Sequence, residues 1–160
     1  MSVYADTNFF TNSLLELAHS PDADLLLESL RQSQVAPLPV TWLLRMEFTN
    51  ALQRLVFETR HGTQRLRVTP ESAMLAEAEF IKEAEEGVLT REQTLPLDDL
   101  EAVFDMLARR HTAKHGFRTY DLFHVASALV LGCDTFWSFD VKAAKLARLE
   151  GLLTMKETPR

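Results

Sequence analysis

Short apolar segments alternate with longer segments of helical periodicity along the 160-residue chain. The apolar segments have the length and composition of β-strands, and they lie at 3–5, 35–39, 94–97, 135–139 and 151–154. Between them, apolar residues recur at helical spacing in 9–17, 25–30, 44–56, 70–87, 100–108, 119–130 and in a segment after Asp140. This alternation predicts a three-layer α/β/α fold around a short parallel central sheet.

Residue types at the ends of these segments predict where helices and strands stop. Pro39 favours an end to the second strand, because proline cannot donate a ladder hydrogen bond. Thr41 and Thr119 are suitable N-caps for the helices that follow them. Asp98 and Glu101 have the spacing of a capping box, which predicts a helix start at Asp98 after a strand at 94–97.

Composition is that of one ordinary globular domain, which we expect to span 1–155 with a loose tail at 156–160. Cys133 is the single cysteine, so no disulfide within the chain and no cysteine-based zinc site can form. The first residues lack the pattern of a secretory signal, and no apolar run is long enough for a membrane span, which predicts a cytoplasmic protein. The net charge of −6 argues against a broadly basic nucleic-acid-binding surface.

Four carboxylates are placed at or near the ends of predicted elements: Asp6, Glu47, Asp121 and Asp140. Ligands of parallel sheets bind beyond the carboxyl ends of the strands, where Asp6 and Asp140 lie. Three of the four flank apolar segments, where a carboxylate is costly to desolvate without a partner. A hard ion such as Mg²⁺ or Mn²⁺ prefers oxygen ligands, and it can activate a water for phosphodiester cleavage.

Each of these acids also has an ordinary structural explanation. Aspartates are favoured at helix N-termini, so Asp6, Asp121 and Asp140 could be simple capping residues. Glu47 alone is typical of a solvated helix position. The joint pattern of four acids is what favours a shared metal site over four independent explanations.

Four motifs, in order and spacing, resemble those of PIN-domain nucleases over nearly the whole chain, from residue 3 to about residue 153. Each motif is weak alone, and the set is specific. They are YADTN at 4–8, RMEFTNAL at 45–52, YDLFHVASA at 120–128, and SFD at 138–140 followed by 145–147 and 151–152.

The resemblance implies a function and a set of partners. VapC-type toxins of toxin–antitoxin pairs are the most similar group, and they imply Mg²⁺- or Mn²⁺-dependent cleavage of RNA by Asp6, Glu47, Asp121 and Asp140. They also imply a small antitoxin protein as partner and a homodimer. The segment 61–92 is long for compact members, which suggests an extra helical flap.

Three further residues lie next to the proposed acids. Asn8, Ser138 and His124 would orient the carboxylates or a metal-bound water, as residues that support metal ligands do. Ordinary turn and cap chemistry explains Asn8 and Ser138 equally well. A histidine buried for structural reasons is the alternative for His124.

Basic residues gather before Asp121 and are candidates for contacts with the phosphates of a substrate: Arg109, Arg110, Lys114 and Arg118. Charge complementarity at a helix C-terminus is an equally good explanation. The basic stripe on the last helix, at 142, 145 and 148, is typical of a solvated face. His111 and His115 have zinc-binding spacing but no third ligand nearby.

Other classes of protein fit the sequence less well. A phosphatase of the haloacid-dehalogenase type would need a second aspartate at position 8, which is Asn8. A receiver domain would need an acidic pair before Asp6 and a lysine after a late strand, and neither is present. A non-catalytic PIN-like interaction module would be expected to lose acids that this chain keeps. A PIN nuclease that processes RNA outside any toxin pair remains an alternative.

Overall fold

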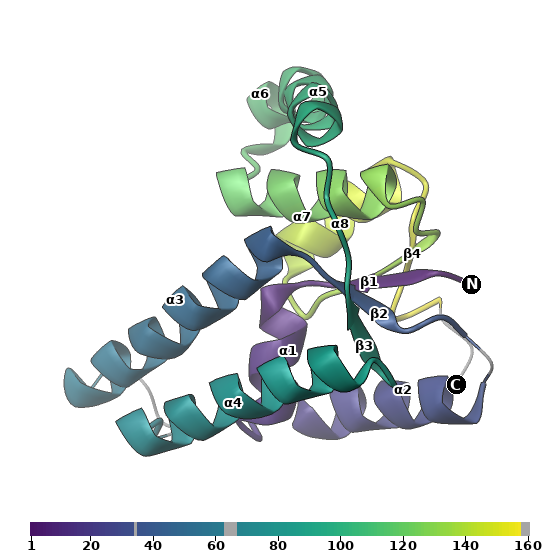
Figure 1. Cartoon of the computed structure of the whole chain (residues 1–160). Coiled ribbons are helices and arrows are strands. Elements are labelled where there is room, and N and C mark those ends of the chain that lie inside the picture. Colours follow the sequence, from purple (N-terminus) through teal and green to yellow (C-terminus); the bar gives the residue numbers. More distant parts are fainter. Residues whose placement is uncertain (34, 63–66, 158–160) are drawn as a thin grey trace.

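A computed structural model of the chain describes residues 1–33, 35–62 and 67–157. Strands and helices alternate, as Figure 1 shows. Their order is β1 (Val3–Ala5), α1 (Thr7–Leu14), α2 (Ser20–Gln32), β2 (Leu38–Val40), α3 (Trp42–Arg60), α4 (Pro70–Glu86), β3 (Thr90–Glu92), α5 (Leu97–Leu107), η1 (Ala108–Thr112), α6 (Ala113–His115), α7 (Thr119–Val130), β4 (Thr135–Trp137), α8 (Val141–Leu149) and β5 (Leu153–Thr154).

The strands are short and parallel. A three-stranded ladder has the order β1-β4-β5, with Val3 opposite Thr135 and Thr135 opposite Leu153. β2 and β3 form a second parallel pair, and β2 lies close to β1. The final strand, β5, lies at the edge of its ladder.

Residues of β1 and β4 alternate between two apolar cores, one on each face of the sheet. Val3, Ala5 and Trp137 pack with residues of α1, α2, α3 and α4. Tyr4 and Phe136 pack with residues of α5, α7 and α8 on the opposite face. Because successive strand residues point to opposite faces, two helical layers cover the sheet. The predicted α/β/α architecture with a parallel sheet is therefore confirmed.

Two of the predicted strands are displaced. The strand expected at 94–97 is wrong, since β3 lies earlier and consists largely of exposed polar residues that give no apolar signal. Leu95 is buried without belonging to a strand. β2 includes Pro39 instead of ending there. The backbone amide of Leu38 and the carbonyl of Val40 hydrogen-bond toward β3. The backbone of Pro39 between them faces away from β3, so its missing amide hydrogen costs no bond in this pair.

Helix starts also differ from the predicted ones. α1 begins at Thr7, and Asp6 is its N-cap. The capping box at Asp98 is wrong, because α5 begins at Leu97 with Pro96 at the cap position and no side-chain cap. α7 begins at Thr119 itself, so the cap position belongs to Arg118. A π-helical turn, η1, joins α5 to α6, and nothing in the periodicity predicts it.

The segment 61–92 does not form a separate flap. Its helix α4 buries Ala73, Ala76 and Phe80 against α1 and α3, and its strand β3 pairs with β2. Residues 63–66 of this segment lie outside the described residues. The expected tail at 156–160 is described as far as Glu157, which closes a turn with Thr154. Among the described residues, no helix is both long and apolar enough to cross a membrane.

Candidate active site

The carboxyl ends of β1 and β4 bring Asp6 and Asp140 to one edge of the sheet. Ala5 is opposite Trp137 in the parallel ladder, and the Asp6 amide donates to the Trp137 carbonyl over 3.1 Å. Each aspartate then caps the helix that follows its strand, Asp6 for α1 and Asp140 for α8. The chain therefore places two carboxylates where ligands of parallel sheets bind.

Asp6 is a buried carboxylate, only 4% exposed. Its Oδ1 accepts from the Phe9 amide over 3.0 Å, and Ser138 also hydrogen-bonds to it. Burial raises the pKa of Asp6 to about 6, although the charge of His124 and these hydrogen bonds act to lower it. The nearby charge of Glu47 acts in the same direction as burial.

Glu47 projects from α3 toward the residue after Asp6. Its Oε2 accepts from the Thr7 hydroxyl over 2.5 Å and contacts Nε2 of His124. The other ring nitrogen of His124 is 2.9 Å from the hydroxyl of the fully buried Tyr4. Partial burial acts to raise the pKa of Glu47, but the bonds from His124 and Thr7 and the charge of Arg118 lower it below its usual value. Tyr4 thereby holds His124 in place, and His124 and Thr7 together hold the Glu47 carboxylate.

Arg118 joins the other two acids. Its Nη2 lies 3.0 Å from Oδ1 of Asp121 and 2.5 Å from Oδ2 of Asp140, and its Nε lies 3.2 Å from Oδ2 of Asp121. The Asp121 side chain is 6% exposed, whereas that of Arg118 is 62% exposed. Arg118 thus neutralises a buried carboxylate from the solvent side.

Backbone groups complete the bonding of these acids. The Arg118 amide donates to Asp121, and the amides of Lys142 and Ala143 donate to Oδ1 of Asp140. Although burial acts to raise the pKa of Asp140, Arg118 and these amides lower it below its usual value.

Ser138 connects the two halves of this arrangement. Its hydroxyl accepts from the Asp140 amide over 2.9 Å and hydrogen-bonds to Asp6. The four acids are therefore neighbours in one polar network, which we call the acidic network: Asp6, Glu47, Asp121 and Asp140 with Thr7, Arg118, His124 and Ser138. Asn8, also expected near the acids, is exposed, and its backbone carbonyl accepts from Asn12.

Most of the predicted phosphate-binding patch lies elsewhere. Arg109 pairs with Asp105, and Arg110 pairs with Glu150. Lys114 is exposed in α6, and of the four basic residues Arg118 is the one that the structure brings onto the acids.

The zinc-type histidine pair has a structural partner instead. Nε2 of His111 lies 2.5 Å from Oε1 of Glu150, and the rings of His111 and His115 are 6.2 Å apart. Among the described residues no cluster of three or more histidine, cysteine, aspartate or glutamate side chains is arranged to hold a metal.

The acids of the network still have the donor chemistry that a hard divalent ion requires. Asp6 is a desolvated carboxylate with a raised pKa, a state that a cation relieves. At Asp121 and Asp140 the guanidinium of Arg118 supplies the positive charge, so an ion that used these two would have to displace it. The residues therefore fit Mg²⁺ or Mn²⁺ once Arg118 moves from its carboxylates.

Sequence reasoning missed the role of Thr7 and of Tyr4, and it assigned Arg118 to a phosphate-binding patch instead of to the carboxylates. Thr7 directly follows Asp6, and Arg118 precedes Asp121 by three residues, the spacing of a capping interaction. Either spacing could have drawn attention to them. Tyr4 has no such signal, because a tyrosine inside an apolar strand is typical of a core residue.

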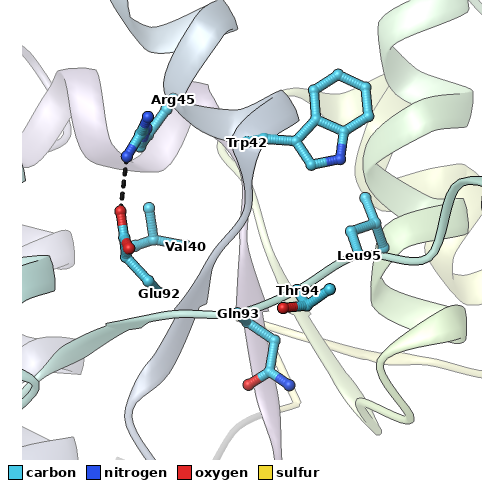
Figure 2. Close-up of a pocket in the computed structure, with 7 residues that line it drawn as sticks. All are labelled: Val40, Trp42, Arg45, Glu92, Gln93, Thr94 and Leu95. Atoms are coloured by element: carbon cyan, nitrogen blue, oxygen red, sulfur yellow. Dashed lines mark hydrogen bonds and ion pairs between the residues drawn. The ribbon is translucent and has the colours of Figure 1, made fainter.

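A separate cavity of about 470 Å³ lies on another side of α3 and contains none of the four acids. Figure 2 shows Trp42 and Leu95 along this cavity, with an ion pair of 2.6 Å between Arg45 and Glu92. We therefore do not assign the proposed catalytic site to this cavity, because none of the four acids lines it.

The fold is similar to that of three solved structures. A VapBC2 structure from Rickettsia felis, bound to a DNA fragment from its promoter, matches with a TM-score of 0.64 and 13% identity over 96% of this chain and 97% of that one. VapC20 of Mycobacterium tuberculosis, a toxin that cleaves the sarcin–ricin loop, matches with a TM-score of 0.62 and 16% identity over 94% and 97% of the two chains.

A third structure, FitAcB from Neisseria gonorrhoeae, matches with a TM-score of 0.57 and 15% identity over 95% of each chain. No protein-family profile matches the sequence, and no curated protein matches it significantly. At these identities the comparisons establish the fold, and the fold expected from the four motifs is confirmed.

Proposed function

We propose that the protein is a Mg²⁺- or Mn²⁺-dependent endoribonuclease that hydrolyses phosphodiester bonds at the acidic network. The observation that carries the proposal is the meeting of four acids from four elements at one edge of the sheet, with Asp6 desolvated and linked through Ser138 to Asp140. The fold shared with a toxin that cleaves the sarcin–ricin loop supports RNA as the substrate.

Asp6, Asp121 and Asp140 would hold the ion, with Glu47 beside them. When bound, such an ion supplies a water of lowered pKa and positive charge for the reacting phosphate. His124 and Thr7 fix the Glu47 carboxylate through Oε2, so that its other oxygen, Oε1, can accept a proton from a neighbouring water. Arg118, once off its carboxylates, has a planar set of donors that suits a phosphate.

The finer proposal is that the protein is the toxin of a toxin–antitoxin pair and acts in the cytoplasm. Two of the matched structures are the VapBC2 and FitAcB complexes, and a small antitoxin and a homodimer are proposed by analogy with them. Expression of the chain alone should arrest growth, and Asp6→Asn should abolish the arrest. If the purified enzyme cleaves RNA but its expression is harmless, it is a PIN nuclease outside any toxin pair.

A non-catalytic PIN-like interaction module is the second candidate. The observation that favours it is Arg118, which neutralises Asp121 and Asp140 without any metal. In that case Mn²⁺ would neither raise the melting temperature nor produce any cleavage of RNA.

The test is cleavage of an end-labelled RNA of mixed sequence with Mn²⁺ and with EDTA. We expect cleavage with Mn²⁺ alone, and Asp6→Asn should lower the rate roughly a thousandfold, the value of several kcal/mol of lost metal-ion catalysis. Asp22→Asn, at an exposed position in the first turn of α2, is the matched control and should cleave normally. Cleavage that survives EDTA, or that Asp6→Asn leaves unchanged, would contradict the proposal.

A further inference from the structure

A second cavity opens directly beside the acidic network. It has a volume of about 170 Å³ and shares Ser138 and Asp140 with the network. Its remaining lining comes from the turn before α8, from α8 itself, and from the end of β5 and the residues that follow it. Ligand pockets for a whole drug-sized molecule measure about 300–1,000 Å³, so this cavity suits a smaller group, such as one base or one phosphate.

Two cationic side chains line the cavity, Arg148 from the last turn of α8 and Lys156 from the turn after β5. Both are exposed, and among the described residues neither has a salt-bridge partner. Glu157, next to Lys156 in sequence, accepts at Oε2 from the amide and hydroxyl of Thr154, over 2.8 and 2.9 Å, and its carboxylate also interacts with the charge of Arg148. Because neither cation is held in a salt bridge with a described residue, both can bind an anionic ligand.

Apolar side chains also line the cavity, chiefly Phe139, Val141 and Met155. Phe139 is held in place by the ring of Phe9, stacked at 5.8 Å, and by the ring of His19, stacked at 4.6 Å. Val141 is 78% exposed, so its side chain is accessible to a ligand in the cavity. An apolar wall opposite two cations suits a ligand with a flat base and a phosphate.

We propose that this cavity is a nucleotide subsite, which holds the nucleotide next to the scissile phosphate of an RNA strand. The inference rests on the proposed ribonuclease function and adds a substrate contact that the motifs did not predict. Arg148 and Lys156 bind the flanking phosphate, and the base lies against Val141 and Met155. Because Asp140 forms one end of the cavity, a strand bound there passes the acidic network.

The first test is binding of a fluorescent single-stranded RNA of mixed sequence to the full chain in EDTA, which keeps the RNA intact. Arg148→Ala and Lys156→Ala should each weaken binding by up to about tenfold, the scale of one charge-assisted hydrogen bond. The slope of log affinity against log salt should fall by about 0.7 for each phosphate that the variant no longer binds. Both positions are exposed, and unchanged melting temperatures will show that the variants are folded.

Lys145→Ala is the matched control, since it removes the same charge from the same helix. Its ammonium lies 3.2 Å from His115, and it does not line the cavity. We expect Lys145→Ala to bind RNA nearly as wild type does, with an unchanged salt slope. Equal losses for Lys145→Ala and Arg148→Ala would overturn the subsite, because binding would then depend on net charge alone.

The second test uses cleavage with Mn²⁺. Arg148→Ala and Lys156→Ala should raise KM and leave kcat within about threefold, because the subsite binds substrate without touching the reacting atoms. If wild type binds and cleaves RNA and both variants match it, the subsite is wrong and the proposed function stands. If wild type neither binds nor cleaves RNA under any condition, both proposals fail.

Discussion

Asp6 and Asp140 follow paired strands at one edge of the sheet, yet their carboxylates lie in opposite surroundings. Asp6 is buried, and among the described residues it has no salt-bridge partner, so burial raises its pKa to about 6. Asp140 is partly exposed and contacts Arg118 and two backbone amides, which hold its pKa below the usual value despite the effect of burial.

This contrast indicates how the network would respond to a divalent ion. At Asp6 the ion would relieve a desolvated charge that nothing else neutralises fully. At Asp140 and Asp121 the ion would compete with a guanidinium that already contacts both carboxylates. We therefore expect Arg118 to lower the apparent affinity for such an ion while it stabilises the metal-free protein.

The largest effect on stability is expected from Asp6→Asn in EDTA. The folded-state pKa is raised from 3.8 to about 6, so the folded protein binds the proton more tightly than the unfolded chain does. The cost of the buried charge is therefore absent below about pH 4 and complete above about pH 6, where it amounts to up to about 3 kcal/mol at about 1.4 kcal/mol per pKa unit. Asparagine removes the charge and still caps α1.

Urea unfolding between pH 4 and pH 8 measures this difference. Wild type should lose stability as the pH rises through this range relative to Asp6→Asn, and the two proteins should agree at the acidic end. Asp22→Asn, an exposed aspartate in another helix, should follow wild type throughout. A pH-independent gap between Asp6→Asn and wild type would mean that the charge of Asp6 is not destabilising.

A smaller effect of opposite sign is expected from Arg118→Ala. Removing the guanidinium leaves Asp121 buried without its cation, which should cost about 2 kcal/mol in EDTA. Mn²⁺ should restore more stability to this variant than to wild type, because the ion no longer has a competitor. A hundredfold excess over the dissociation constant contributes about 2.7 kcal/mol to a protein that binds only when folded.

Thermal melts of both proteins with EDTA and with increasing Mn²⁺ test this expectation. Arg109→Ala removes an exposed ion pair with Asp105 and should change neither the stability nor the Mn²⁺ response appreciably. An Mn²⁺ shift that is smaller in Arg118→Ala than in wild type would mean that Arg118 assists the ion instead of competing with it.

The sequence predicts the parts of this site that follow from strand ends. Val3–Ala5 is an apolar strand that ends at an aspartate, and 135–139 is an aromatic strand with Asp140 after it, so both acids could be placed at the sheet edge. β3 could not be placed, because only Thr90 of its three residues is buried. Its position depends on pairing with β2, and pairing partners far apart in sequence leave no local pattern.

Contacts between side chains that are far apart in sequence likewise cannot be predicted from the hydrophobic pattern. Glu47 and His124 are 77 positions apart, and only the packing of α3 against α1 and the sheet brings them together. Arg118 looked like part of a basic patch because its neighbours in sequence are basic. The π-helical turn and Gly116 separate it from them, and Gly116 has a φ of 65°, which favours glycine.

The smallest effect is expected from Tyr4→Phe, which removes only the hydroxyl 2.9 Å from Nδ1 of His124. The phenyl ring still fills the fully buried position, and it still stacks on Phe136, so the change leaves the core packed. Loss of the buried hydroxyl, which also hydrogen-bonds to Thr41 and Ser127, should cost about 1 kcal/mol of stability. The bond to His124 also sets which His124 nitrogen faces Glu47, so cleavage should slow by up to about tenfold, the lower range for a residue that orients a metal-site ligand.

Tyr120→Phe changes the chain's other tyrosine, which is half exposed, and should alter neither the stability nor the cleavage rate. Urea unfolding in EDTA and cleavage rates with Mn²⁺ separate the two contributions. A loss of stability with a wild-type cleavage rate would show that Tyr4 only packs the core and that His124 holds Glu47 without it.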